Sequence, residues 1–126
     1  MSGTTLDTGA LIALEAGSAR MRALVRTALA AGAPLAVPAG VLAQAWRASA
    51  RQARLAQLLR ASITEVVVLD RRAALTVGRL CAATGASDVV DVSVVVCARE
   101  RGHGVVTSDP GDLAAIDPGL TLLAPS

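Results

Sequence analysis

Four aspartates stand where a site for phosphate chemistry could be built. Asp7 and Asp109 each follow a short apolar segment, whereas Asp88 and Asp91 open a long apolar stretch three residues apart. Several carboxylates within about 4 to 6 Å of one another repel unless a cation lies between them. Oxygen ligands without His or Cys suit Mg²⁺ or Mn²⁺, which can activate water and stabilise charge on a phosphate. These residues therefore suggest metal-dependent phosphodiester hydrolysis.

Each aspartate also has a purely structural explanation. Asp7 and Asp109 can cap the helices that follow them, with Pro110 suited to the first helical position. Asp88 and Asp91 have a spacing like that of a capping box and complement a helix dipole. Capping is favoured for each aspartate alone. Their shared location favours a site, because the carboxyl ends of parallel strands lie along one edge, where open α/β folds bind ligands.

Short strands and helices alternate along the chain and must bring the aspartates to that edge. We expect strands at Thr4–Leu6, Leu35–Val37, Thr64–Leu69 and Gly104–Thr107, with a possible edge strand at Leu120–Leu123. We expect helices from Leu11 to Gly17, over Ala19–Ala31, Gly40–Ser49 and Arg51–Ala61, from Asp70 to Gly85, and over Val89–Arg101 and Pro110–Ile116. This alternation predicts one α/β domain over residues 1–126, with a short, mostly parallel sheet between two helical layers.

The composition excludes several kinds of chemistry. The chain has no Lys, which removes P-loop nucleotide binding and Schiff-base catalysis. It has no Phe or Tyr, so the core must consist of Ala, Val and Leu. For Trp46, packing in the core is favoured over stacking on a base. We expect Cys81 and Cys97 to be buried free thiols and His103 to lie in an exposed turn, which disfavours nucleophilic or His-based metal sites.

An uncharged run of 20 residues, Thr27–Trp46, is long enough to be tested as a membrane span. Two glycines and two prolines interrupt it, so it is better divided among three buried elements. The start of the chain carries no positive segment before Asp7, so we expect no secretory signal. A cytoplasmic protein without membrane contact is the resulting expectation.

Positive charge is concentrated in one part of the sequence. Residues 16–64 hold seven arginines and no acid, whereas the rest holds five arginines and all ten acids. Arg47, Arg51 and Arg54 have the spacing of one helix face, and Arg22 and Arg26 lie one turn apart on another. These arginines could neutralise RNA phosphates, grip an acidic partner, or simply keep an apolar protein soluble.

Three segments together resemble the PIN-domain ribonucleases, and most closely the VapC toxins of bacterial toxin–antitoxin pairs. The segments are Leu6–Leu14 (LDTGALIAL), Asp91 at the start of an apolar helix, and Val106–Asp109 (VTSD). The resemblance extends over nearly the whole chain in the same order of elements. It implies a Mg²⁺- or Mn²⁺-dependent endoribonuclease that is usually dimeric and is held inactive by a cognate antitoxin.

The resemblance also assigns roles to particular residues. Asp7, Asp91 and Asp109 match the family's metal-holding acids, and Thr107 matches the polar residue that supports the last of them. The family commonly has a Glu where this chain has Gln44, which removes one negative charge from the site. We favour Asp88 as the carboxylate that restores this charge. The alternative is a catalytically weakened module that acts by binding RNA or its antitoxin.

Overall fold

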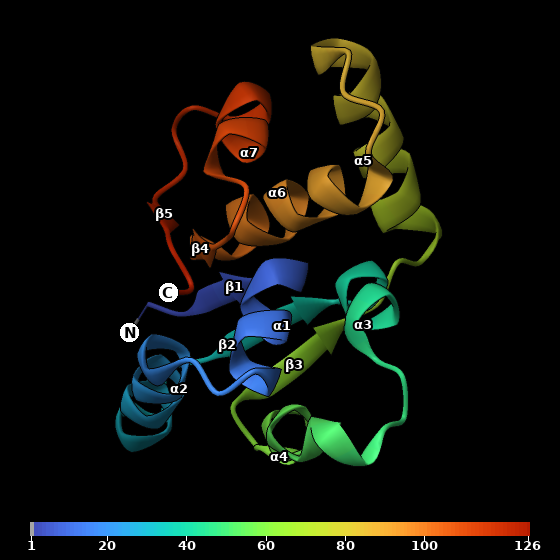
Figure 1. Ribbon diagram of the computed structural model, residues 1–126. Coiled ribbons are helices and arrows are strands. Elements are labelled where there is room, and N and C mark those ends of the chain that lie inside the picture. The colour runs from blue at the N-terminus through green and yellow to red at the C-terminus, as the bar shows by residue number, and fades with distance from the viewer. Residues whose placement is uncertain (1) are drawn as a thin grey trace.

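The computed structural model describes residues 2–126, in which strands and helices alternate as expected (Figure 1). The strands are β1 (Thr4–Leu6), β2 (Leu35–Pro38), β3 (Thr64–Val67), β4 (Gly104–Val106) and β5 (Leu122–Leu123). The helices are α1 (Thr8–Glu15), α2 (Ala19–Ala31), α3 (Ala39–Ala45), α4 (Ala53–Arg60), α5 (Arg71–Thr84), α6 (Val89–Arg101) and α7 (Pro110–Ile116), and a 3₁₀ turn, η1 (Ala50–Gln52), precedes α4.

The strands form one parallel sheet in the order β3-β2-β1-β4-β5. The chain first builds outward from β1 through β2 to β3 and then returns to place β4 on the other side of β1. The strand order therefore reverses between β1 and β4, where Leu6 pairs with Val106. Open α/β sheets bind ligands outside the carboxyl ends of the strands at such a reversal.

Helices cover both faces of the sheet, which gives the three-layer architecture expected from the sequence. Helix α6 packs on β1, β2 and β4, and α5 and α7 pack against α6. On the other side, α1 contacts β1 and α4 contacts β3, with α2 packed against α1 (Figure 1).

The core is built from small aliphatic side chains, as the composition requires. Val37, Val105 and Val106 of the sheet are fully buried, and Val95 of α6 and Leu11 of α1 pack in the same core from either side. Full burial of one such side chain stabilises the fold by about 1.5 to 3 kcal/mol. The aspartates at the strand ends are thus supported by a rigid apolar layer.

Two expected elements end two or more residues earlier in the structure. Strand β3 stops at Val67 because its neighbour β2 ends at Pro38, which leaves the next residues of β3 without a partner strand. The helix expected over Gly40–Ser49 ends at Ala45, because the backbone of Trp46 is extended.

The uncharged stretch Thr27–Trp46 is divided among α2, β2 and α3, as expected. Within residues 2–126, no single helix is long and apolar enough to cross a membrane. Helices α5 and α6 reach the required length and composition only as a pair bent by 108°.

Candidate active site

Asp7 lies at the end of β1, where its backbone N–H donates to Val106 O of β4 at 3.1 Å. Its carboxylate accepts the Ala10 N–H at 2.9 Å and so caps α1. The side chain is nearly buried, and this burial raises the pKa of Asp7 above its usual value. Hydrogen bonds from the Thr107 hydroxyl and the Ala10 N–H oppose the rise, whereas the charge of Asp109 adds to it.

Thr107 connects the two strand ends that flank the reversal. Besides its hydrogen bond to Asp7, its hydroxyl oxygen accepts the Asp109 N–H at 2.9 Å. The side chain is buried, so it has little freedom to leave these partners. Thr107 therefore holds the backbone of Asp109 at the end of β4.

Asp109 occupies the residue before α7, but its carboxylate makes no capping hydrogen bond. The capping explanation is thus wrong for Asp109, whereas it holds for Asp7 and also for Asp88, whose carboxylate accepts the Asp91 N–H at 3.0 Å. Unlike these two caps, the Asp109 carboxylate accepts no hydrogen bond from the helix that it precedes.

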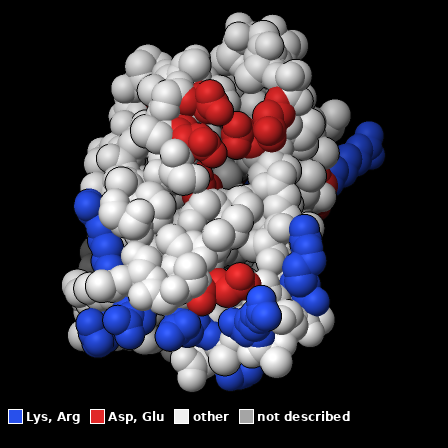
Figure 2. Space-filling view, in the orientation of Figure 1, with Lys and Arg blue, Asp and Glu red and all other residues white. Residues whose placement is uncertain are grey.

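The aspartates meet in a polar cavity of about 330 Å³ at the carboxyl ends of β1 and β4. Asp7, Asp88, Asp91 and Asp109 all line it, together with Gln44 of α3. Figure 2 shows acidic side chains gathered around a hollow in the half of the molecule that holds α5, α6 and α7. Within residues 2–126, no Arg or His lines this cavity. Its surface is therefore strongly anionic.

Asp112 is a fifth carboxylate at this cavity, and the sequence motifs did not point to it. It lies in the first turn of α7, three residues after Asp109. Residues three apart are neighbours on the surface of a helix, so Asp112 lies beside Asp109 at the start of α7. This spacing is the feature of the sequence that could have indicated Asp112.

Among the carboxylates of this cavity, Asp91 has a strongly raised pKa. Burial and the charges of Asp88, Asp112, Asp109 and Asp7 raise the pKa of Asp91 to about 6, with burial the largest cause. A neighbouring cation would reverse this repulsion, because it favours the charged form of every carboxylate around it.

The donors fit Mg²⁺ or Mn²⁺ in chemical type, since every charged group at the cavity is a carboxylate. Within residues 2–126, no three His, Cys, Asp or Glu side chains already converge on one ion position. Binding would therefore require carboxylates to turn into the cavity. Gln44 has a partner of its own, because its side-chain oxygen accepts the Thr8 hydroxyl.

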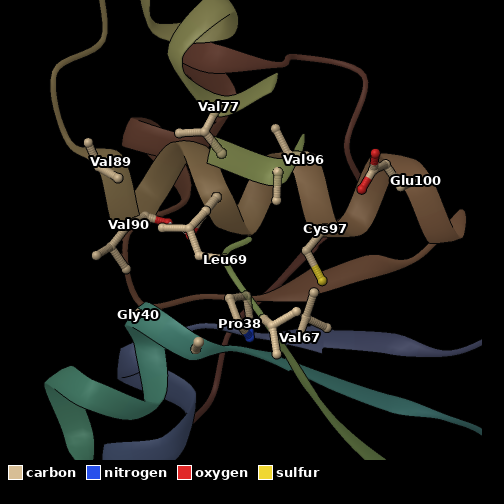
Figure 3. A pocket seen from close by; sticks show the side chains of 14 residues that line it. Pro38, Gly40, Val67, Leu69, Val77, Val89, Val90, Val96, Cys97 and Glu100 are labelled. Atoms are coloured by element: carbon tan, nitrogen blue, oxygen red, sulfur yellow. The ribbon is translucent and has the colours of Figure 1, made fainter. Parts of the chain in front are cut away.

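A second cavity nearby is unsuited to this chemistry. Figure 3 shows its lining of valines together with Pro38, Leu69 and Cys97, with Glu100 as its charged side chain. Its volume is only about 50 Å³. Val90 lines both cavities and so separates the apolar cavity from the anionic one.

The five arginines expected to bind RNA or the antitoxin fall into two groups. Arg22, Arg26 and Arg54 line a cavity of about 270 Å³ between α2 and α4. Arg47 and Arg51 instead lie on the exposed segment between α3 and α4. The expectation that Arg47, Arg51 and Arg54 share one helix face is therefore wrong, because α3 ends before Arg47.

Three other expectations also need correction. His103 is buried instead of exposed, with its Nδ1 3.1 Å from the Thr5 hydroxyl, and the absence of a side chain at Gly3 leaves room for its ring. Both cysteines are free thiols, but only Cys97 is buried. Trp46 is 37% exposed and lies outside the core cluster, because it follows the last turn of α3.

The comparisons with known proteins agree with this architecture. The fold matches VapBC from Salmonella typhimurium, solved bound to DNA, with a TM-score of 0.70, 20% identity and full coverage of both chains. VapBC2 from Rickettsia felis, bound to a fragment of its promoter DNA, matches with a TM-score of 0.69 and 16% identity over 96% of this chain and 97% of that one. FitAcB from Neisseria gonorrhoeae matches with a TM-score of 0.63 and 18% identity over 97% of each chain.

A search among curated proteins finds no match. The PIN domain family model matches residues 4–117, which include every aspartate of the cavity and the whole sheet except β5. The family expected from the three sequence segments is thus confirmed, and this chain belongs to the PIN domain family.

Proposed function

We propose that this protein is the toxin of a VapBC-type toxin–antitoxin pair and acts as a Mg²⁺- or Mn²⁺-dependent endoribonuclease. One observation carries the proposal: five carboxylates from three parts of the chain face one cavity that no Arg or His lines within residues 2–126. PIN domains are generally nucleases, and the structural relatives are toxin–antitoxin complexes.

In this proposal Asp7, Asp91 and Asp109 hold the metal ion, and Asp88 supplies the charge that Gln44 lacks. A bound Mg²⁺ or Mn²⁺ would activate water and stabilise negative charge on the phosphate. Thr107 keeps two of the ligands aligned through its hydrogen bonds to Asp7 and Asp109. The raised pKa of Asp91 implies that this residue must lose its proton before it can bind a metal ion.

Thermal unfolding tests the metal site directly. Purified protein is unfolded in EDTA and with increasing Mn²⁺ or Mg²⁺, beside the variant Asp91→Asn. A cation at about 100 times its Kd adds about 2.7 kcal/mol of stability, which raises Tm by several degrees for a domain of this size. We expect this rise in the wild type and its loss in Asp91→Asn.

Asp70→Asn is the matched control. Asp70 also precedes a helix and accepts a backbone N–H, from Ala73 at 2.9 Å, but it does not line the anionic cavity. Its variant should keep the full metal-induced rise. Cleavage of labelled single-stranded RNA then follows, with activity expected in the wild type and Asp70→Asn and absent in Asp91→Asn.

A catalytically weakened binding module is the second candidate. Two observations favour it: the neutral Gln44 at the cavity, and the absence, within residues 2–126, of three ligands already gathered at one point. It predicts no rise of Tm with either cation. Replacement of Asp7 would then cost only the roughly 0.5 to 2 kcal/mol of a lost helix cap.

The antitoxin is the partner that we assign to the groove between α2 and α4. Val25, Leu29 and Leu58 give this groove an apolar floor, and Arg22, Arg26 and Arg54 supply positive charge around it. Within residues 2–126 none of these arginines forms an ion pair, since the two pairs found join Arg99 to Asp117 and Arg101 to Glu65. An amphipathic acidic helix would complement both properties.

We also propose that the chain forms a homodimer. Val68, Leu69 and Val89 are substantially exposed around the apolar cavity of Figure 3, which offers an apolar contact surface. Analytical ultracentrifugation of wild type and Val68→Glu tests this. A dimeric wild type and a monomeric variant are expected, and a monomeric wild type would contradict the proposal.

A further inference from the structure

Gln44 differs in kind from the other polar residues of the anionic cavity. Among the side chains that line this cavity within residues 2–126, it alone carries N–H groups. The five carboxylates can only accept hydrogen bonds when they are charged. A phosphate group needs donors, so the direction in which the Gln44 amide points decides what this residue can do at the site.

The contact between Gln44 and Thr8 fixes that direction. Gln44 lies near the end of α3, Thr8 is the first residue of α1, and these two helices pack against each other. The Thr8 hydroxyl donates to the side-chain oxygen of Gln44. Within residues 2–126, the side-chain nitrogen of Gln44 has no hydrogen-bond partner, although it carries two N–H donors. The nitrogen is therefore the end of the amide that is free to bind a ligand.

The charge of the cavity favours the same orientation. A side-chain amide turns its dipole to suit the field around it, and five carboxylates attract the N–H end and repel the carbonyl oxygen. The observed arrangement places the oxygen on the Thr8 hydroxyl and so keeps it from the carboxylates. Gln44 is thus poorly placed to bind a cation through its oxygen and well placed to donate hydrogen bonds.

A donor has a clear use in this cavity. Its carboxylates repel the phosphates of RNA, and no Arg or His lines it within residues 2–126 to offset this repulsion. Hydrogen bonds to an ionised acceptor are about twice as strong as those between neutral groups. A donor fixed where charge develops on a reacting group also accelerates the reaction. An ionised Glu at position 44 would supply no donor and would add to the repulsion.

We infer that Gln44, with its oxygen held by Thr8, donates a hydrogen bond to a non-bridging oxygen of the phosphate that is cleaved. This inference rests on the proposed ribonuclease function, because it names a further residue that contacts the substrate at the same site. Thr8 is a positioning residue, since it acts through Gln44. The neutral side chain then serves substrate binding, and its lack of charge is no sign of a weakened enzyme.

Two substitutions of Gln44 separate substrate binding from metal binding. Gln44→Ala should keep the Mn²⁺-induced rise of Tm and bind RNA roughly tenfold more weakly, the loss expected for one hydrogen bond to a charged group. Gln44→Glu should bind Mn²⁺ more tightly, because it adds a carboxylate, and should nevertheless bind RNA more weakly than the wild type. If Gln44 only marks a lost metal ligand, Gln44→Glu would instead improve both.

Both quantities are measured on the full chain. Thermal unfolding over a Mn²⁺ series gives the response to the cation. Anisotropy of a labelled 2′-O-methyl oligoribonucleotide in Mn²⁺ gives RNA binding, and a gel confirms afterwards that the oligoribonucleotide is intact. A salt concentration of about 200 mM weakens the diffuse contacts of surface arginines with phosphates. Thr8→Val, which keeps the shape of the side chain but cannot donate, should lose part of the RNA binding and keep the Mn²⁺ response.

Gln57→Glu is the matched control. Gln57 is an exposed residue of α4 that does not line the anionic cavity, and the assay contains no antitoxin. Its variant carries the same change of charge and should bind Mn²⁺ and the oligoribonucleotide like the wild type.

The outcomes distinguish this inference from the proposed function. A wild type without any rise of Tm in Mn²⁺ would overturn the proposed function and this inference with it. A wild type that shows the rise, beside a Gln44→Ala variant with unchanged RNA binding or a Gln44→Glu variant with tighter RNA binding, would overturn this inference alone.

Discussion

The carboxylates of the anionic cavity differ in whether they form hydrogen bonds that stabilise the fold. Asp7 and Asp88 cap helices, so the needs of the fold alone could explain their positions. Asp109 makes no capping hydrogen bond, and Asp91 carries a pKa raised to about 6. A raised pKa, and a carboxylate without a capping hydrogen bond, favour a ligand site over a purely structural role for these two residues.

The raised pKa of Asp91 predicts how stability depends on pH in the metal-free protein. The unfolded value is 3.8 and the folded value about 6, so the folded state holds the proton more tightly. Its contribution to the free energy of unfolding is fully present below about pH 4 and is lost as the pH rises through about 6. Solvent screening limits the loss to roughly 1 to 2 kcal/mol.

Asp91→Asn should remove this dependence and stabilise the protein in EDTA at about pH 7.5, where the wild-type carboxyl is ionised. Urea unfolding in EDTA near pH 4.5 and near pH 7.5 measures it as the difference between variant and wild type. Asp70→Asn should follow the wild type under both conditions. A variant that is less stable than wild type at the higher pH would show that Asp91 serves the fold and not a ligand.

Single residues were the least predictable level from sequence. The pattern of apolar residues around His103 and Trp46 gave no sign that the first would be buried and the second exposed, because both lie at element ends. His103 is buried because Gly3, just before β1, leaves space for its ring and Thr5 of β1 provides a hydrogen-bond partner. Asp112 could not be assigned to a site from sequence, because an acidic residue in the first turn of a helix is common for structural reasons alone.

At the level of elements, helix starts and ends marked by Asp and Gly were predicted well. The segment from Asp70 to Gly85 and the helix Val89–Arg101 agree with the structure. The end of α3 comes earlier than its sequence predicts, because it depends on Gln52, whose side chain reaches back to Ala45 and Arg47. Such contacts between residues several positions apart leave no periodic signal in the sequence.

Gly9 controls how closely the first turn of α1 approaches the loop after β4. A Cβ on Gly9 would overlap Ser108 Oγ and would lie 2.7 Å from Ser108 Cβ. Gly9→Ala should therefore push this loop away from Asp7, cost about 1 to 3 kcal/mol of stability, and lower the metal-induced rise of Tm.

Ser108→Gly in the Gly9→Ala background removes both clashing atoms, so the double variant should regain most of the stability and metal response of the wild type. Thermal unfolding with and without Mn²⁺ compares the two variants with Ser108→Gly alone. Failure of the second substitution to rescue the first would mean that the close approach of these loops does not position the aspartates.

At the scale of the whole molecule, negative and positive charge are concentrated in different regions. Five of the ten acidic residues line the cavity over the strand ends, and arginines are spread around α2 and α4 in the opposite half, with a smaller acidic patch among them (Figure 2). The uneven charge and two groups of arginines were predicted from the sequence, but the sequence placed Arg54 with Arg47 and Arg51, whereas the structure places it beside Arg22 and Arg26. That division depends on where α3 ends and on the packing of α2 beside α4.

This division predicts that the two arginine groups act on different partners. Arg47→Glu with Arg51→Glu should weaken binding of a labelled 2′-O-methyl oligoribonucleotide, a strand that is not cleaved, and flatten the salt dependence of this binding. The log–log slope should fall by about 0.7 for each phosphate that these arginines no longer neutralise. Arg22→Glu with Arg26→Glu should leave that slope unchanged, because these residues line the groove between α2 and α4.

The groove pair should instead weaken binding of a cognate antitoxin. Anisotropy over a salt series, from about 50 to about 300 mM, measures binding of the oligoribonucleotide. Co-purification with the antitoxin encoded beside the gene measures binding of the antitoxin. Arg71→Glu controls for net charge, since Arg71 lies on α5 and lines neither the groove nor the anionic cavity. If both double variants flatten the slope equally, the arginines act together through their summed charge. If each double variant affects one partner alone, RNA and antitoxin use separate surfaces. RNA binding can then persist in the inhibited complex.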